Sequence, residues 1–240
     1  MIRINKYLSM CGVTSRRGAE TFIKQRRVTI NDITLDKLGV IVDEASDTVK
    51  VDGVAVTPVS EIVYVVMNKP RMVMTTLHDP FKRPTVVQYL KELHNRVYPV
   101  GRLDYDSEGV LILTNDGDFA FRLAHPRYRV KKIYEARVKG HFQREQADRI
   151  MRGIRLDDGA IGRAEQVSIL GFAGKMTRIR LILTEGRKRE IKQLCKKVGY
   201  PVEHLVRVDF GGISLRSLRA GQWRHLTDRE VQKLKSSVGL

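Results

Sequence analysis

Hydrophobic positions in residues 1–58 predict two short helices followed by two short strands. Apolar side chains recur at the three- and four-residue spacing of a helix face in two runs: Ile4, Tyr7, Leu8 and Cys11, then Ala19, Phe22 and Ile23. Thr14 or Ser15 is placed to cap the second helix. The β-branched segments 28–31 and 48–51 predict strands.

Residues 62–240 alternate predicted strands with predicted helices. Strands are expected at 62–67, 109–114, 133–138, 167–170, 178–184 and 205–208. Helices are expected at 119–123, 145–151, 191–198 and after Thr227, with Glu230 as its capping-box partner. This order predicts an α+β domain with a mixed, largely antiparallel sheet. Residues 58–61 resemble a short linker, so we expect two domains, 1–58 and 62–240.

Composition and charge narrow the class of partner. The chain is 42% hydrophobic, enough for a core, and its net charge of +17 indicates a polyanionic partner. No apolar run is long enough to span a bilayer, and the first residues lack the apolar core of a signal peptide, so we expect a cytoplasmic protein away from membranes. The two cysteines and six histidines have no metal-ligand spacing, and we expect no metal.

The N-terminal positive charge is concentrated in the first half of the small domain. Residues 1–31 contain seven basic residues against Glu20 alone. The basic residues are Arg3, Lys6, Arg16, Arg17, Lys24, Arg26 and Arg27. This half is a candidate phosphate-contacting surface, and a solvated helix face is an equally good interpretation of the charge alone.

Three carboxylates and an arginine gather in segment 101–109, just before the apolar strand. Asp104, Asp106 and Glu108 follow Arg102 in this segment. A carboxylate there can act as nucleophile, base or metal ligand. A calcium loop is disfavoured, because Asn115 stands where a bidentate glutamate is needed. A glycosidase pair and a plain polar turn remain open at this point.

A second cluster combines basic side chains with an aromatic one. Residues 175–224 contain 13 basic residues against 4 acidic ones. Arg189 and Lys192 are three apart and are expected to share a helix face. Tyr134 follows a basic stretch at 127–132, where it either stacks on a nucleobase or packs in the core as a strand residue.

The N-terminal segment resembles the alpha-L RNA-binding domain. The likeness rests on 3–8, Gly12, 15–17, 19–20, Ile23 and 28–31. The resemblance implies that the small domain binds RNA. The candidate RNA contacts, taken from the two basic clusters, are Arg3, Lys6, Arg16, Arg17, Arg26 and Arg27 in this domain and Arg187 and Arg189 in the larger one.

The larger segment is similar to the RsuA-type ribosomal pseudouridine synthases. The likeness begins with Gly101-Arg102-Leu103-Asp104 and continues through 107–118. Further family-like stretches are 67–70, 98–100, 124–126, 132–135, 183–194, 206–208 and 218–226.

That resemblance implies a cofactor-free enzyme that isomerises uridine to pseudouridine in ribosomal RNA. It implies Asp104 as the catalytic aspartate, Arg102 holding the flipped nucleotide, Tyr134 stacking on the base, and Lys192 pairing with Asp104. Many family members have arginine in place of Lys192, and the string 188–190 also departs from the commoner family pattern.

The expected substrate is a uridine of ribosomal RNA, free or in a pre-ribosomal particle, modified by a monomer. The residues at 185–194 and 205–215 are more similar to those of large-subunit enzymes of this family than to those of small-subunit ones, which favours large-subunit (23S) RNA. The alternatives are the same reaction on small-subunit (16S) RNA, a non-catalytic rRNA-binding factor, and a glycosidase using Asp104 and Glu108. The large positive charge disfavours the glycosidase.

Overall fold

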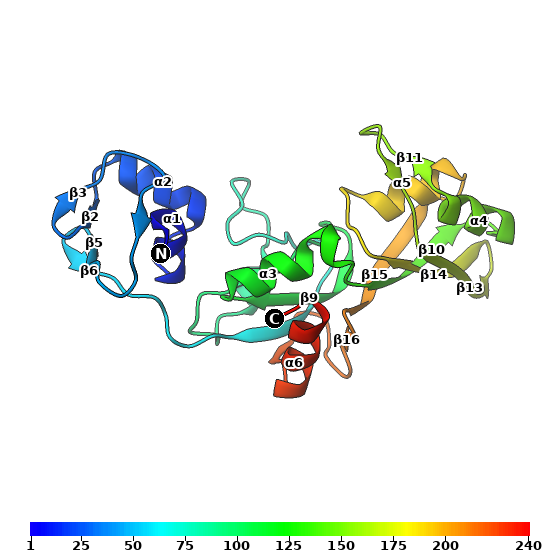
Figure 1. The fold of residues 1–240 in the computed structure, drawn as a ribbon. Coiled ribbons are helices and arrows are strands. Elements are labelled where there is room, and N and C mark those ends of the chain that lie inside the picture. Colours follow the sequence, from blue (N-terminus) through cyan, green and yellow to red (C-terminus); the bar gives the residue numbers. More distant parts are fainter. The chain divides into compact units, whose positions relative to one another are not determined.

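The computed structural model describes residues 1–240, which divide into two compact units, Met1–Ile62 and Val63–Leu240 (Figure 1). Each unit has its own hydrophobic core, and the two are described separately. No helix is long and apolar enough to cross a membrane.

The N-terminal unit packs two helices against short strands. Helices α1 (Ile4–Met10) and α2 (Arg16–Lys24) are joined by a turn, and Ser15 caps α2 by accepting a hydrogen bond from the Gly18 amide at 3.0 Å. A small sheet has the order β3-β2-β5-β6, and a separate ribbon pairs β1 with β4. The strand bounds are β1 Ile2–Arg3, β2 Val28–Ile30, β3 Ile33–Thr34, β4 Ile41–Val42, β5 Val49–Val51 and β6 Val54–Ala55.

The larger unit is built on one mixed sheet of nine strands. The main path runs β13-β14-β10-β15-β9-β7-β17, with β16 on β15 and β8 on β9. Every pair is antiparallel except β9 with β15. The bounds are β7 Tyr64–Lys69, β8 Tyr98–Pro99, β9 Glu108–Thr114, β10 Lys132–Lys139, β13 Gln166–Ala173, β14 Met176–Leu183, β15 Val202–Phe210, β16 Ile213–Ser214 and β17 Trp223–His225. A two-stranded ribbon pairs β11 (Ile154–Arg155) with β12 (Ile161–Gly162).

Strand β9 is buried on both faces and divides the larger unit into two cores. Leu111 and Leu113 belong to the core that includes residues of α4 (Arg144–Arg152) and α5 (Glu190–Lys197). Val110 and Ile112 belong to the other core, which includes residues of α3 (Gly117–Ala124) and α6 (Asp228–Ser237). Because successive side chains point to opposite faces, an unbroken apolar run is needed here.

Gly109 allows β9 and β15 to meet at the start of their parallel pairing. Its φ is +111°, and a Cβ at this position would lie 2.2 Å from the carbonyl oxygen of Arg207. Only glycine tolerates this backbone and this approach. The pairing sets Arg207 opposite Gly109, directly after the carboxylate segment.

The predicted α+β class, the mixed sheet and the main elements are confirmed. The capping box of Thr227 and Glu230 is confirmed as well. One prediction is wrong: α5 begins at Glu190, and Arg189 has a left-handed backbone (φ +53°), so Arg189 and Lys192 do not share a helix face. The remaining short elements were not predicted because they are too short for a periodicity; besides strands they include the 3-10 turns η1 (Val86–Tyr89) and η2 (Pro126–Tyr128).

Candidate active site

Segment 101–109 forms a fixed loop between β8 and β9, and its last two residues, Glu108 and Gly109, begin β9. Leu103 is buried, and the Thr75 hydroxyl donates to its carbonyl oxygen at 2.7 Å. The Met72 amide donates to the carbonyl oxygen of Tyr105 at 2.7 Å. These bonds hold the backbone on both sides of Asp104, whose side chain stays about one-third exposed (32%). Asp104 is therefore presented to solvent from a rigid support, as a reacting group requires.

Lys69 lies fully buried at the end of β7 and anchors the same loop. Its ammonium donates to the carbonyl oxygens of Ser107 at 2.7 Å and Pro70 at 2.8 Å. Burial lowers the pKa of Lys69 to about 8, against the opposing effect of Asp104, Asp106 and Glu108. Sequence reasoning did not select Lys69; a lysine that ends an apolar strand was the available signal.

Lys192 on α5 contacts two carboxylates of the loop. Its Nζ lies 3.8 Å from Oδ2 of Asp104 and makes a shorter hydrogen bond to Oδ1 of Asp106. Burial raises the pKa of Asp106 and the Lys192 ammonium lowers it, with a net result below its usual value. The structure has the expected contact of Lys192 with Asp104 and adds a second partner, Asp106. A turn, closed by the Ser107 amide on the Asp104 carbonyl oxygen, brings both carboxylates to the same lysine.

Tyr134 and Arg207 face each other across β10 and β15. Tyr134 is 8% exposed and Arg207 is 2% exposed. The guanidinium donates from Nε to the Val110 carbonyl oxygen at 2.7 Å and from Nη1 to the Tyr134 hydroxyl at 3.5 Å. Arg207 was not selected from the sequence, although an arginine alternating with apolar residues in a predicted strand is a recognisable signal.

Two further charged groups are buried where β10 meets the segment before α5. Lys132 donates to the carbonyl oxygens of Val130 at 3.1 Å and Thr184 at 3.4 Å, and burial lowers its pKa to about 8. Glu190 accepts the Arg187 amide at 2.9 Å, and burial raises its pKa to about 7. These contacts fix the segment that leads into the helix of Lys192.

The remaining predicted site residues are basic, and they differ in whether they form an ion pair within the protein. Arg102 and Arg189 are exposed and form no ion pair. Arg187 lies 3.2 Å from Glu185 and 3.9 Å from Asp158. In the N-terminal unit, five of the six predicted RNA contacts are exposed without an ion pair: Arg3, Lys6, Arg16, Arg17 and Arg26.

Arg27 differs from the other N-terminal basic residues. It makes two hydrogen bonds to Asp52, at 2.8 and 2.6 Å, and lies 4.0 Å over the ring of Phe22. Its charge is balanced within the unit, so Arg27 is less available to an anionic partner than Arg16 or Arg17, which have no ion pair.

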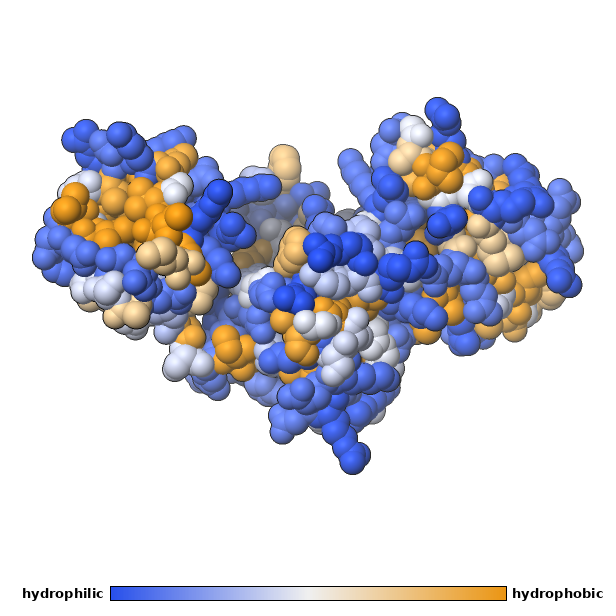
Figure 2. Space-filling view, viewed as in Figure 1, coloured by the Kyte–Doolittle hydropathy of each residue, from blue (hydrophilic) through white to orange (hydrophobic).

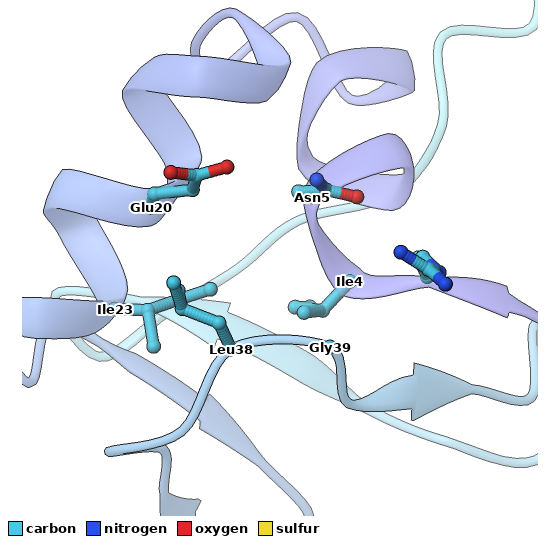
Figure 3. A pocket seen from close by; sticks show the side chains of 7 residues that line it. Ile4, Asn5, Glu20, Ile23, Leu38 and Gly39 are labelled. Atoms are coloured by element: carbon cyan, nitrogen blue, oxygen red, sulfur yellow. The ribbon is translucent and has the colours of Figure 1, made fainter.

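A cavity of about 210 Å³ lies within the N-terminal unit (Figure 3). It is lined by Arg3, Ile4, Asn5, Glu20, Ile23, Leu38 and Gly39. Figure 2 shows hydrophobic residues gathered on this unit, whose exposed apolar side chains include Ile33, Ile41 and Val54. Neither feature gathers carboxylates and cations as segment 101–109 does, so the latter is the candidate active site. No group of three or more His, Cys, Asp or Glu side chains is arranged to hold a metal ion.

The chain is similar to known proteins over its whole length. Residues 63–197 match the family model described as RNA pseudouridylate synthase, and residues 2–49 match the S4 domain. An "Uncharacterized RNA pseudouridine synthase" of Aquifex aeolicus is 41% identical over 100% of this chain and 96% of the relative. "Ribosomal large subunit pseudouridine synthase B" of Bacillus subtilis is 39% identical over 98% and 96%. A solved structure described as a pseudouridylate synthase superposes with a TM-score of 0.70 at 26% identity, covering 98% of this chain and 100% of that one.

Proposed function

Because the chain belongs to the RNA pseudouridylate synthase family, with an S4 domain at its N-terminus, we propose that it modifies one uridine of large-subunit ribosomal RNA, with Asp104 as its catalytic aspartate. The substrate is supported by full-length relatives named large-subunit synthases. The residue is supported by one observation: Asp104 is a partly exposed carboxylate on a fixed loop, 3.8 Å from the Lys192 ammonium.

The reaction exchanges one bond of the uridine for another. The C1′–N1 bond breaks, the uracil turns, and a C1′–C5 bond forms while the C5 proton is lost and N1 gains one. Asp104 acts on the sugar side, either by attacking C1′ as a nucleophile or by removing a proton to give a glycal-type intermediate. Both routes need an ionised carboxylate within reach of the sugar.

Two lysine ammoniums bring positive charge to the loop that carries Asp104. Lys192 contacts Asp104 directly. Lys69 donates to the backbone carbonyl oxygen of Ser107 in the same loop, and its positive charge interacts with the loop carboxylates. Lys192 also binds Asp106, so Asp106 orients the lysine between the two. In this scheme Asp104 reacts with the sugar. Lys192 and Lys69 place positive charge beside it, and Asp106 orients Lys192.

RNA recognition is divided between the two domains. Tyr134 stacks on the extruded base and exposed Arg102 occupies the place that the nucleotide leaves. Exposed Arg3, Lys6 and Arg16 of the S4 domain contact phosphates. The substrate is free rRNA or a pre-ribosomal particle, the enzyme acts as a monomer, and its location is the cytoplasm.

A pseudouridine map of ribosomal RNA with and without this gene tests the proposal. The expected result is the loss of one modified position in large-subunit RNA, restored by the wild-type gene and not by Asp104→Asn. Loss of a position in small-subunit RNA instead would assign the alternative substrate. Unchanged maps of both RNAs would leave a non-catalytic rRNA-binding factor.

A further inference from the structure

Arg207 is a buried cation without a carboxylate partner. It is the largest fully buried side chain of the protein, and it forms no ion pair. Its Nη2 is buried with no hydrogen-bond partner at all. Removing a guanidinium from water without pairing it is costly, so this arrangement needs a reason.

The surroundings of Arg207 raise that cost further. Buried Lys69 and Lys132 both have their pKa lowered, first by burial and also by the positive charge of Arg207. The guanidinium lies 4.9 Å over the ring of Phe210, which compensates part of the charge. An apolar side chain of similar length would fill the same space at lower cost. Packing alone therefore does not explain an arginine here.

Arg207 also contacts Tyr134, the residue that the proposed function stacks on the target base, and an apolar side chain could not make this contact. The two residues are paired across β10 and β15, and Nε is already anchored on the Val110 carbonyl oxygen of β9. Nη1 reaches the Tyr134 hydroxyl at 3.5 Å, and the guanidinium carbon lies 6.0 Å from the ring centre. The guanidinium thus lies at the hydroxyl end of the phenol ring, where it restrains the direction in which the ring points.

We propose that Arg207 is a positioning residue that fixes the Tyr134 ring for stacking on the target uracil. It connects the ring to β9, the strand that directly follows the Asp104 loop. The stacked base and Asp104 are then both held by contacts to β9, so their relative position is fixed more tightly. The inference rests on the proposed function, because it needs a base that stacks on Tyr134.

The test is single-turnover pseudouridine formation at saturating ribosomal RNA, with RNA affinity and thermal unfolding measured on the same full-length proteins. The wild type is compared with four variants: Arg207→Met, Arg207→Lys, Tyr134→Phe and the double variant Tyr134→Phe/Arg207→Met. We expect Arg207→Met to lower the saturated rate between about 10-fold and 100-fold. RNA affinity stays near wild type, and Arg207→Lys retains more of the rate. The double variant is no slower than the slower single variant, because both remove one interaction.

Arg224→Met is the matched control. Arg224 is a part-buried arginine whose bonds to Glu230, at 2.7 and 2.8 Å, are structural. This change should lower the unfolding temperature and leave the saturated rate intact. Rates that multiply in the double variant, or a Tyr134→Phe variant as fast as wild type, would overturn the inference. If Arg207→Met does not fold, the cycle of Arg207→Lys with Tyr134→Phe decides by the same criterion. A wild type that forms no pseudouridine would refute the proposed function itself, whereas an active wild type with uncoupled variants refutes only the role of Arg207.

Discussion

The buried ammonium of Lys69 makes the stability of the catalytic domain depend on pH. Lys69→Met removes the charge and keeps an unbranched side chain of similar length. The pKa of Lys69 is about 8 in the folded protein against an ordinary value of 10.5. A difference of this size corresponds to about 3 kcal/mol of unfolding free energy, since each pKa unit is worth about 1.4 kcal/mol.

The sign follows from which state binds the proton. Below about pH 8 Lys69 is protonated in both states, and the folded protein bears the full cost of burying the charge. Between about pH 8 and 10.5 the folded state has released a proton that the unfolded state keeps, so the unfolding free energy rises with pH. Relative to Lys69→Met, the wild type should gain about 2 kcal/mol between about pH 8 and 9.5.

Urea unfolding followed by tryptophan fluorescence measures this difference. Trp223 is the only tryptophan and pairs with Met67 on the strand that carries Lys69, so its signal reports the correct domain. Groups such as Lys132 and Cys195 titrate in both proteins and cancel in the comparison. The exposed Lys175→Met controls for the loss of one positive charge. A difference that changes by less than about 0.5 kcal/mol across this window would refute the reasoning.

Three further predictions follow from the site and its support. Gly109→Ala should destabilise the catalytic domain by about 2 to 4 kcal/mol, because the added Cβ would lie 2.2 Å from a carbonyl oxygen of β15; a urea-unfolding loss below about 1 kcal/mol contradicts this. Lys192→Ala should slow single turnover at saturating RNA at least about tenfold, while exposed Lys196→Ala on the same helix leaves it unchanged; an unaltered Lys192→Ala rate restricts this lysine to phosphate contact. Replacing Arg16 and Arg17 together by alanine should reduce the log–log salt slope of RNA binding by about 1.4 to 1.8, and an unchanged slope shows that these residues do not touch RNA.

The sequence was sufficient to place the loop of the candidate active site and most of the secondary structure. A carboxylate cluster bounded by Gly101 and Gly109 before an unbroken apolar run predicts a loop feeding a central strand, and β9 is that strand. Repeating apolar positions likewise located α2, and the capping box of Thr227 and Glu230 located α6. Local chemistry fixed these elements, so a single sequence was enough.

Buried charges could not be predicted, because their burial depends on strand order. Arg207 lies in a strand that looks half-exposed in sequence, yet β15 runs between β9 and β10 and encloses it. Lys69 ends a strand beside a proline, and only the pairing of β7 with β9 places it under the Ser107 carbonyl. Periodicity describes one strand at a time and carries no information on its neighbours.

Charge counts also overlook partners distant in the chain. Arg27 belongs to a basic half-domain in sequence but is bonded to Asp52, 25 residues further on. Lys192 was expected on Asp104 and has its closer contact with Asp106, since two carboxylates of one turn reach the same ammonium. A resemblance can assign a role to a position, but it does not predict which of two nearby carboxylates lies closer to a shared lysine.

The central claim is that Asp104 carries the chemistry of uridine isomerisation. Its most direct test is single-turnover pseudouridine formation on ribosomal RNA by Asp104→Asn, with RNA affinity measured in parallel and exposed Asp118→Asn on α3 as control. Asp104→Asn keeps the size of the side chain and removes its charge. We expect no detectable pseudouridine, RNA affinity close to wild type, and full activity in the control. Activity of Asp104→Asn at a substantial fraction of the wild-type rate would contradict it.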